Sequence, residues 1–316
     1  MGNTVSSQYS PEGLRPSGEY FWSEYRSKMW KRCRREYFLH YYASQSGKLS
    51  YATENERELL RRRALVSASG YFLRTVHSAA NATFNAERPF ADTKNGHVNF
   101  AEQYSRILWR IFRQDRKAIL LETNWNDPEL PFPIALYFDH SHSPEEFFQE
   151  LTDAVTRATR DFFQSPWREL LAELTAFDIV PTRVIESFPV AECTVFLKIP
   201  CAFRLSGKVY TVSFCNASRP ASELAITAAL HKLWAFHHWK NSPERTTTLF
   251  FTPGANDRNF RYVPDDMLQI SMVLDKIKSE VGFFANITPA TSPDSLPRSP
   301  ESCETCRFRG LCSDLF

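Results

Sequence analysis

Four of the seven cysteines in this chain are placed as the ligands of a metal centre could be. Cys303, Cys306 and Cys312 form the pattern C-x2-C-x5-C in CETCRFRGLC near the C-terminal end, and Cys33 lies far upstream in SKMWKRCRREYFLHYY. The C-terminal segment follows a stretch rich in proline and serine, and it is too short to bury enough apolar surface to hold itself in place. Three thiolates converging on a metal centre would hold it, and the fourth ligand would then come from the other end of the chain.

The identity of the metal stays open on these residues, because four thiolates suit both a tetrahedral zinc ion and an iron–sulfur cluster. The other three cysteines, Cys193, Cys201 and Cys215, fall in segments expected to form strands. Free cysteine is commonly a small buried apolar residue, and we expect that role for these three. A second metal site or a catalytic thiol is the alternative.

The composition is that of a folded globular protein. With 316 residues, 43% of them hydrophobic, the chain is long enough to bury a core in one large domain or two smaller ones. No apolar stretch approaches the length needed to cross a bilayer, and the polar N-terminal residues lack the profile of a signal peptide. We therefore expect a cytoplasmic protein with no membrane partner, whose cysteines stay reduced.

Charge is unevenly distributed although the net charge is only +2. Residues 1–120 carry 20 Lys and Arg against 11 Asp and Glu (+9), and the remainder carries 18 against 25 (−7). Such basic patches attract phosphate backbones without reading sequence, whereas the simpler alternative is a solvated helix face. The aromatic residues between these basic residues are expected to pack inward. The candidate nucleic-acid contacts, called the basic run below, are Arg26, Lys28, Lys31, Arg32, Arg34 and Arg35.

Hydrophobic periodicity predicts helices in the first half of the chain and a mixture of strands and helices in the second. The order strand–strand–strand–helix–strand–helix indicates an α/β protein, with a mixed-sheet core flanked by helices behind a helical N-terminal half. Ser206-Gly207 is expected to join two strands tightly. The expected helices are 21–43, 54–87 (one or two helices), 100–117, 143–163, 220–240 and 264–284, and the expected strands are 180–188, 193–205, 209–215 and 246–251.

The same pattern divides the chain into parts of different character. A Pro/Ser-rich linker is expected between the core and the last cysteines. We call the segment after this linker the cysteine tail. The expected parts are a flexible tail (1–18), a helical half with the first cysteine of the centre (19–177), an α/β core (178–287), the linker (288–302) and the cysteine tail (303–316).

The chain resembles the PD-(D/E)XK nuclease superfamily, in particular its RecB-like branch of iron–sulfur exonucleases. The segment around Cys33 is similar to the Cys-x-Arg-x-Tyr-Tyr segment of that branch, and GYFLRTVH, ending at His77, is similar to its Gly…Val-His motif. FLKIPCAFRLSGKVYTVSFCNAS is similar to the hairpin that carries the catalytic residues. The resemblance spans 21–312. It implies a restriction-endonuclease-like core and a [4Fe–4S] cluster that closes the domain as a clasp. Its implied ligands are Cys33, Cys303, Cys306 and Cys312, with zinc as the alternative metal.

The catalytic positions that the resemblance implies carry the wrong chemistry for hydrolysis. The family needs an acidic residue on the first strand of the hairpin and Asp/Glu-x-Lys on the second, where side chains two apart share a face and converge on Mg²⁺. Here these positions are Pro200, Ser213 and Cys215, while a Gln-x-x-x-Tyr motif on the next helix has become Glu223 and Thr227. Without carboxylates, Mg²⁺ has almost no protein charge to hold it. No catalytic residue is therefore expected, and His77 is a vestige.

The resemblance thus implies a catalytically inactive, iron–sulfur-stabilised nuclease-like protein. It would bind DNA, or serve as a scaffold subunit beside a helicase or an active nuclease, in DNA repair or antiviral (anti-phage) defence. One alternative is an active metal-dependent exonuclease with relocated acids, for which Glu186 and Glu192 are the candidates. Another alternative is an adaptor that binds only protein.

Overall fold

The structure is a computed structural model. It describes residues 20–64, 68–84, 106–110, 178–183, 185–215, 218–240, 242–252, 260–261 and 270–314, together with 113, 149, 153, 174 and 263. The expected tail at 1–18 lies outside these residues. So do most of the expected helices 100–117 and 143–163, of which 106–110 and the single positions 113, 149 and 153 are helical.

A tight hairpin forms the centre of a mixed sheet that has five strands among the described residues. Strands β5 (Cys201–Leu205) and β6 (Lys208–Phe214) pair antiparallel across a two-residue turn. Both turn residues have positive φ, 49° at Ser206 and 74° at Gly207, as the right-handed twist of a hairpin requires. The sheet has the order β2-β5-β6-β7-β8, and β6 and β7 are its parallel pair. The other strands are β2 (Ile179–Val180), β7 (Thr246–Phe251) and β8 (Phe260–Arg261).

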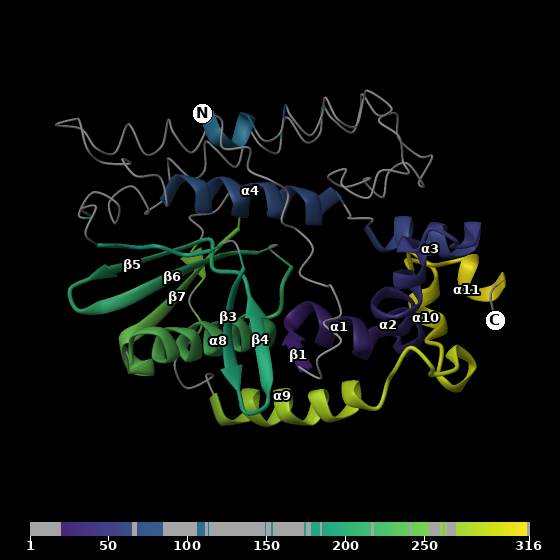
Figure 1. Cartoon of the computed structure of the whole chain (residues 1–316). Helices are drawn as coiled ribbons and strands as arrows, with labels where there is room; N and C mark the ends of the chain where they lie inside the picture. Colours follow the sequence, from purple (N-terminus) through teal and green to yellow (C-terminus); the bar gives the residue numbers. More distant parts are fainter. Residues whose placement is uncertain are drawn as a thin grey trace.

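Helices α4 (Ala68–Phe84) and α8 (Ala221–Trp239) cover opposite faces of this sheet (Figure 1). Alternation along β6 divides its side chains between them. Val212 and Phe214 pack with α4, and Cys215, just beyond the strand, packs with α8. Helix α8 crosses over between β6 and β7. It ends at Lys240, whose φ of 55° is the left-handed conformation common after a helix.

A second sheet joins the first described residues to the middle of the chain. Strand β1 (Tyr20–Ser23) pairs parallel with β4 (Cys193–Leu197), which pairs antiparallel with β3 (Glu186–Val190). The β3–β4 hairpin extends toward helix α9 (Ile270–Ala285) in Figure 1. The expected strands 180–188 and 193–205 were each wrong as single strands, because each divides between the two sheets. The second divides at Lys198–Pro200, where the chain leaves one sheet and enters the other.

The expected helix 21–43 is likewise wrong as one element. It consists of β1, α1 (Glu24–Arg32) and α2 (Arg34–Tyr41), with a break at Cys33. Cys33 is extended (φ −160°, ψ 117°), and its Sγ accepts the backbone N–H of Glu36 at 3.5 Å, so the thiol takes the place of an N-cap side chain. The expectation that the aromatic residues pack inward is confirmed. The buried ones are Trp30, Tyr37, Phe38, Tyr41 and Tyr42.

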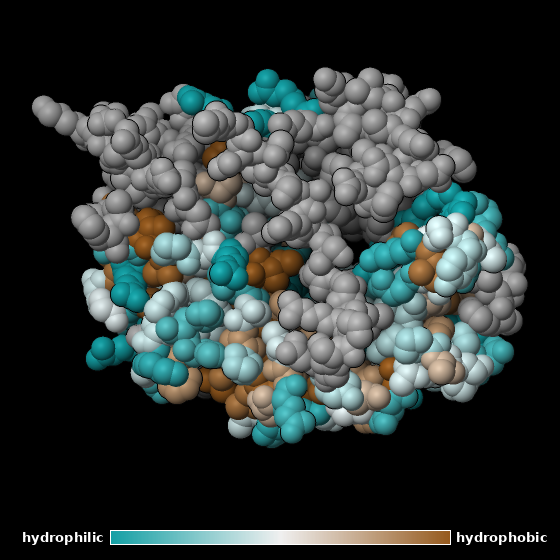
Figure 2. Space-filling model, in the orientation of Figure 1, coloured by the Kyte–Doolittle hydropathy of each residue, from teal (hydrophilic) through white to brown (hydrophobic). Residues whose placement is uncertain are grey.

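The C-terminal elements lie beside α2 and α3 (Glu54–Ala64) at one end of the molecule (Figure 1). Hydrophilic residues cover the surface over α3 (Figure 2). The expected linker 288–302 is not wholly irregular, because helix α10 begins at its end with proline in the first turn. Among the described helices, none is long and apolar enough to cross a membrane. The short elements are η1 (Ala43–Lys48), η3 (Pro243–Arg245), η5 (Pro293–Ser295), α10 (Pro300–Cys303) and α11 (Leu311–Asp314).

Candidate functional site

Hydrogen bonds hold the end of the linker and the cysteine tail against the N-terminal helices. Ser302 Oγ donates to the carbonyl oxygen of Arg32 at 3.2 Å, at the end of α1. Arg307 Nη1 donates to the carbonyl oxygen of Arg63 at 3.0 Å. Arg62 Nη1 donates to the carbonyl oxygen of Arg309 at 2.5 Å. The two ends of the described chain therefore meet at the place where Cys33 interrupts the helix.

Cys33, Cys306 and Cys312 lie near one another in this contact. Burial is the largest cause that raises the pKa of Cys306, to about 11, and the charge of Cys33 adds to the rise. Burial and Cys33 also raise the pKa of Cys312. Cys303 is exposed instead, and its Sγ donates to the carbonyl oxygen of Ser299 at 3.6 Å. Across the parts of the chain that the structure describes, no group of three or more His, Cys, Asp or Glu side chains is arranged to hold a metal ion.

The surroundings of these thiols nevertheless fit an anionic metal centre. Arg35 is only 5% exposed, and its Nη2 donates to Asp294 Oδ1 and to the carbonyl oxygen of Leu296, both at 3.4 Å. Its Nε and Nη1 are buried without an acceptor. The charge of Arg35 acts on Cys312 and opposes the rise of its pKa. Thiolates and the sulfides of a cluster accept hydrogen bonds, so they would satisfy donors that the protein leaves unused.

The hairpin brings the three positions implied by the nuclease resemblance together, but they lie inside the protein. Because Cys201 pairs with Val212, the next position out on each strand places Pro200 opposite Ser213, with Cys215 two residues further. All three are buried. Cys215 packs against residues of α8 and its Sγ lies 3.6 Å from Thr252 Oγ1. The hydrophobic contact between α8 and the sheet therefore covers this side of β6.

Helix α4 brings His77 and Asn81 to the same end of the hairpin. The Nε2 atom of His77 lies 3.4 Å from the carbonyl oxygen of Phe214. Burial, followed by the charge of Lys198, lowers the pKa of His77 to about 3, so the ring is neutral at pH 7. Asn81 Nδ2 donates to the carbonyl oxygen of Pro200 at 3.2 Å, which fixes the chain where it enters β5. Sequence reasoning missed Asn81, although it lies one helical turn after His77 on the same face.

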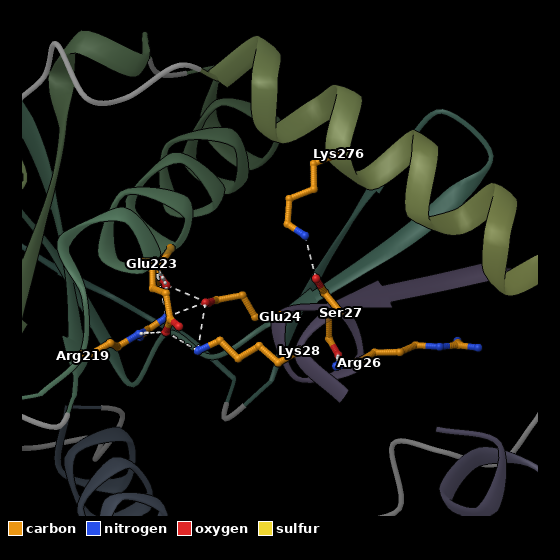
Figure 3. Close-up of polar contacts among 9 residues, drawn as sticks. Glu24, Arg26, Ser27, Lys28, Arg219, Glu223 and Lys276 are labelled. Atoms are coloured by element: carbon orange, nitrogen blue, oxygen red, sulfur yellow. Dashed lines mark hydrogen bonds and ion pairs between the residues drawn. The ribbon is translucent and has the colours of Figure 1, made fainter. Parts of the chain in front are cut away.

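Glu223 and Thr227, which the resemblance would align with a Gln-x-x-x-Tyr motif, belong to a charged network between α1 and α8. Figure 3 shows its members Glu24, Lys28, Arg219 and Glu223. Lys28 Nζ lies 2.5 Å from Glu223 Oε2, and Thr227 Oγ1 donates to Glu24 Oε2 at 2.7 Å. Arg219 donates to Thr227 Oγ1 at 2.7 Å and pairs with both glutamates. Burial raises the pKa of Glu223, but the hydrogen bonds and charges of Lys28 and Arg219 together lower it, so the net pKa is lowered. Two acids and two bases thus neutralise one another.

The basic run divides into buried and exposed members. Arg26 is 4% exposed, and its Nε donates to Tyr37 Oη at 2.6 Å. Arg35 is equally buried, so neither guanidinium lies on the surface. Lys28, Lys31 and Arg32 are exposed but paired with Glu223, Glu280 and Glu36. Arg34 is exposed and lies over the ring of Trp30 at 4.9 Å.

Neither candidate relocated acid is available to the hairpin positions. Glu186 is already hydrogen-bonded, and Glu192 lies at a distance from them. Glu186 is buried and accepts the backbone N–H of Arg183 at 2.5 Å and the indole N–H of Trp234 at 3.4 Å. Glu192 is exposed in the turn between β3 and β4, at the opposite end of β4 from Pro200. A strand of that length alone spans about 16 Å.

Cys193, Cys201 and Cys215 are all buried, as expected for small apolar residues. Burial raises the pKa of Cys193 to about 11 and raises that of Cys201 as well. A thiol whose pKa is raised has little thiolate at pH 7, so neither residue has the character of a nucleophile.

In comparisons with known proteins, no family model and no curated protein matches this chain. A functional assignment therefore depends on the geometry described above. Two features support a functional assignment. The first is the burial of Pro200, Ser213 and Cys215 at the β5–β6 hairpin, called the closed hairpin site below. The second is the contact of the Cys33 region with the C-terminal elements.

Proposed function

We propose that this chain is a PD-(D/E)XK-like protein with a restriction-endonuclease-like core that does not hydrolyse phosphodiesters. A [4Fe–4S] cluster on Cys33, Cys303, Cys306 and Cys312 closes it, and it acts as a DNA-binding or scaffold subunit of a nucleic-acid-processing complex. The α/β architecture, with a mixed sheet flanked by helices, supports this proposal. The single observation that carries the loss of hydrolysis is the burial of Ser213 and Cys215 beneath α8.

This burial matters because hydrolysis needs a metal that both the protein and a phosphate can reach. Mg²⁺ binds through hard oxygen ligands and keeps several waters, so its ligands must face a wet site. The hydroxyl of Ser213 and the thiol of Cys215 carry no charge, and they face the interior of the sheet–helix contact. Glu223, the acid among the aligned positions, is paired with Lys28 and Arg219.

The proposed cluster would contribute its binding energy to folding, because its ligands come from both ends of the chain. The charge of Cys33 acts on both Cys306 and Cys312, which supports a shared site; the thiols would draw closer around the cluster, and the exposed Cys303 would turn inward. Arg35 has two buried donors without an acceptor, and the nearby Arg298 donates to the carbonyl oxygen of Cys312 at 3.4 Å. Both guanidinium groups favour an anionic group at this place. Zinc would use the same thiolates, and metal analysis with absorbance near about 400 nm separates the two.

The DNA-binding part of the proposal relies on exposed cations of the basic run. Lys28, Lys31, Arg32 and Arg34 would offer charge to a phosphate backbone, whereas Arg26 and Arg35 serve the fold. Pairing with acids weakens three of these cations as phosphate ligands, so the affinity for DNA should be modest. Because this affinity depends on phosphate contacts, it should fall steeply as salt is added. This is the expected behaviour of a subunit that works beside a helicase or an active nuclease.

The experiment that tests the proposal incubates purified protein with end-labelled single- and double-stranded DNA in Mg²⁺ or Mn²⁺. We expect salt-sensitive binding without cleavage. Cleavage that is lost in Glu186→Gln or Glu192→Gln would show an active enzyme with relocated acids. Absence of any DNA affinity would favour the adaptor that binds only protein.

A further inference from the structure

Phe283 is a half-exposed aromatic residue near the C-terminal end of α9. Although its ring is apolar, the residue is 51% exposed. Helix α9 lies next to α1 (Figure 1), and two contacts tie the helices together. Lys276 Nζ donates to Ser27 Oγ at 2.7 Å, and Lys31 Nζ lies 3.6 Å from Glu280 Oε1. The ring therefore lies at the surface where these two helices meet.

A set of packed rings fixes the orientation of Phe283. The rings of Phe283 and Trp30 lie nearly parallel, with centroids 6.3 Å apart and 23° between their planes. Trp30 is buried, and it makes edge contacts with Tyr37 and Phe284, whose ring centroids lie 5.1 and 5.8 Å from its own. A surface ring that is held in this way loses little conformational entropy when a ligand stacks on it.

Arg34 adds a positive charge to the same surface. Its guanidinium carbon lies 4.9 Å from the centroid of the Trp30 ring. Arg34 is exposed, and no hydrogen bond or ion pair with a described residue engages it. The other exposed cations of the basic run pair with acids instead, namely Lys28, Lys31 and Arg32. An exposed ring and an unpaired guanidinium thus lie against one buried indole.

This combination distinguishes Phe283 from other exposed apolar residues, which are common on proteins and do not mark a site by themselves. Phe236 on α8 is similarly exposed, but Lys240 Nζ lies over its ring at 5.8 Å, so a cation of the protein already occupies that ring. No cation among the described residues lies over the ring of Phe283. This ring is therefore available to a ligand.

We propose that Phe283 and Arg34 bind an unpaired nucleotide of a single-stranded nucleic acid, with a base stacked on the Phe283 ring and a neighbouring phosphate paired with the Arg34 guanidinium. Aromatic side chains beside cations suit single strands because every base has a flat face, whereas the bases of a duplex are already stacked on one another. This surface shares no residue with the closed hairpin site. The inference deepens the proposed function and rests on its DNA-binding part, because it names the single-stranded form. A protein segment that covers Phe283 is the alternative occupant, and the unpaired charge of Arg34 favours the nucleotide.

The test measures the anisotropy of fluorescein-labelled probes in EDTA over a series of salt concentrations. The probes are an oligothymidine, a strand of the same length in which abasic sites replace the bases, and a duplex. The abasic strand keeps the phosphates but cannot stack. We expect Phe283→Ala to weaken only the binding of oligothymidine, by about five- to tenfold, and to leave the slope of log K against log salt unchanged. Arg34→Ala should weaken the binding of every probe and reduce the slope for oligothymidine by about 0.7, because one phosphate contact is lost.

Matched variants separate the loss of stacking from a change that is only structural. Phe283→Tyr keeps a flat ring and should bind oligothymidine as the wild-type protein does. Phe283→Leu keeps an apolar side chain without a ring and should bind as weakly as Phe283→Ala. Met272→Ala removes another exposed apolar side chain from α9 and should leave all affinities unchanged.

The outcomes separate this inference from the proposed function. If the wild-type protein binds oligothymidine and Phe283→Ala binds it equally well, the stacking site is wrong although DNA binding stands. If Phe283→Ala weakens the abasic strand or the duplex as much as oligothymidine, the ring does not bind unpaired bases and the inference is overturned. If the wild-type protein binds none of the probes, the DNA-binding proposal and the stacking site both fail, and a protein partner becomes the occupant of this surface.

Discussion

The indole nitrogen of Trp22 donates a 2.8 Å hydrogen bond to Oε2 of Glu280 inside the core. The bond joins β1, the first described element, to α9, the last long helix. Lys276 also pairs with Glu280, and Lys276 Nζ donates to Ser27 Oγ at 2.7 Å (Figure 3). Glu280 therefore holds α1 and β1 against α9 independently of the cysteine tail.

We expect Glu280→Gln to lower the free energy of unfolding by about 1.5–3 kcal/mol at pH 7, because a buried charged hydrogen-bond network loses its charge. Burial raises the pKa of Glu280, but hydrogen bonds from Lys276 and Trp22 outweigh it and the net pKa is lowered. A carboxyl with a lowered pKa stabilises the fold above its unfolded pKa and loses this effect as pH falls. The difference from wild type, measured by urea unfolding, should therefore shrink below about pH 4. Asp275→Asn, exposed on the same helix, is the control.

His231 should make the protein sensitive to mild acid. It is fully buried on α8, its Nδ1 lies 2.9 Å from Thr211 Oγ1, and burial lowers its pKa to about 3. Its folded pKa lies below the unfolded value, so its contribution is complete above about pH 6.5 and is lost as pH falls. Between pH 6.5 and 4.5, the unfolding free energy of His231→Gln should fall by about 2 kcal/mol less than that of wild type. An equal pH dependence in both proteins would contradict this, and His238→Gln, exposed on α8, serves as control.

Removal of Cys33 should affect the whole fold and not only the cysteine tail. Protein purified anaerobically should contain iron and sulfide, and Cys33→Ser should lose both, with a fall in Tm of roughly 10 °C or more. Limited proteolysis should then cut within 288–314 first. Cys193→Ala removes a buried thiol outside this contact and should keep its iron. A Cys33→Ser protein with wild-type iron content and Tm would refute the proposed centre.

Two arginines of the basic run, Arg26 and Arg34, should differ in what their substitution by alanine changes: stability in the first case and DNA affinity in the second. Arg26→Ala is expected to destabilise the fold by about 3–5 kcal/mol, since it removes a buried cation that donates to Tyr37 and lies 4.1 Å from the ring of Phe21. Arg34→Ala should change stability by less than about 1 kcal/mol, because only a cation–π contact is lost. Arg34→Ala should instead weaken DNA binding by about threefold at low salt. If Arg34→Ala leaves the salt dependence of DNA binding unchanged, the basic run is not a nucleic-acid surface.

Sequence periodicity predicted the elements of the α/β core closely. The expected strand 246–251 is β7, and the expected helix 220–240 is α8 with its two flanking residues. Ser206-Gly207 forms the expected turn, in which Gly207 adopts a positive φ without steric cost. These elements are set by local signals: alternation of side chains, turn residues and helix ends.

Structural features that depend on contacts between residues distant in sequence could not be predicted from local periodicity. The division of 193–205 between two sheets arises because β4 finds β1 and β3 as neighbours, whereas β5 finds β2 and β6. The break at Cys33 replaces a continuous helix because the thiol caps α2 and the aromatic residues turn inward. The burial of Arg26 and Arg35 within a basic run is likewise a tertiary effect, since sequence marks both as surface residues.

The parallel pairing of β1 with β4 has a consequence for how the protein is made. Tyr20 pairs with Cys193, so the first strand has no partner until well over half of the chain has left the ribosome. Until then the aromatic side chains of α1 and α2 have no core to enter, and contacts this distant in sequence form slowly. Nascent chains of this protein should therefore depend on chaperones during synthesis.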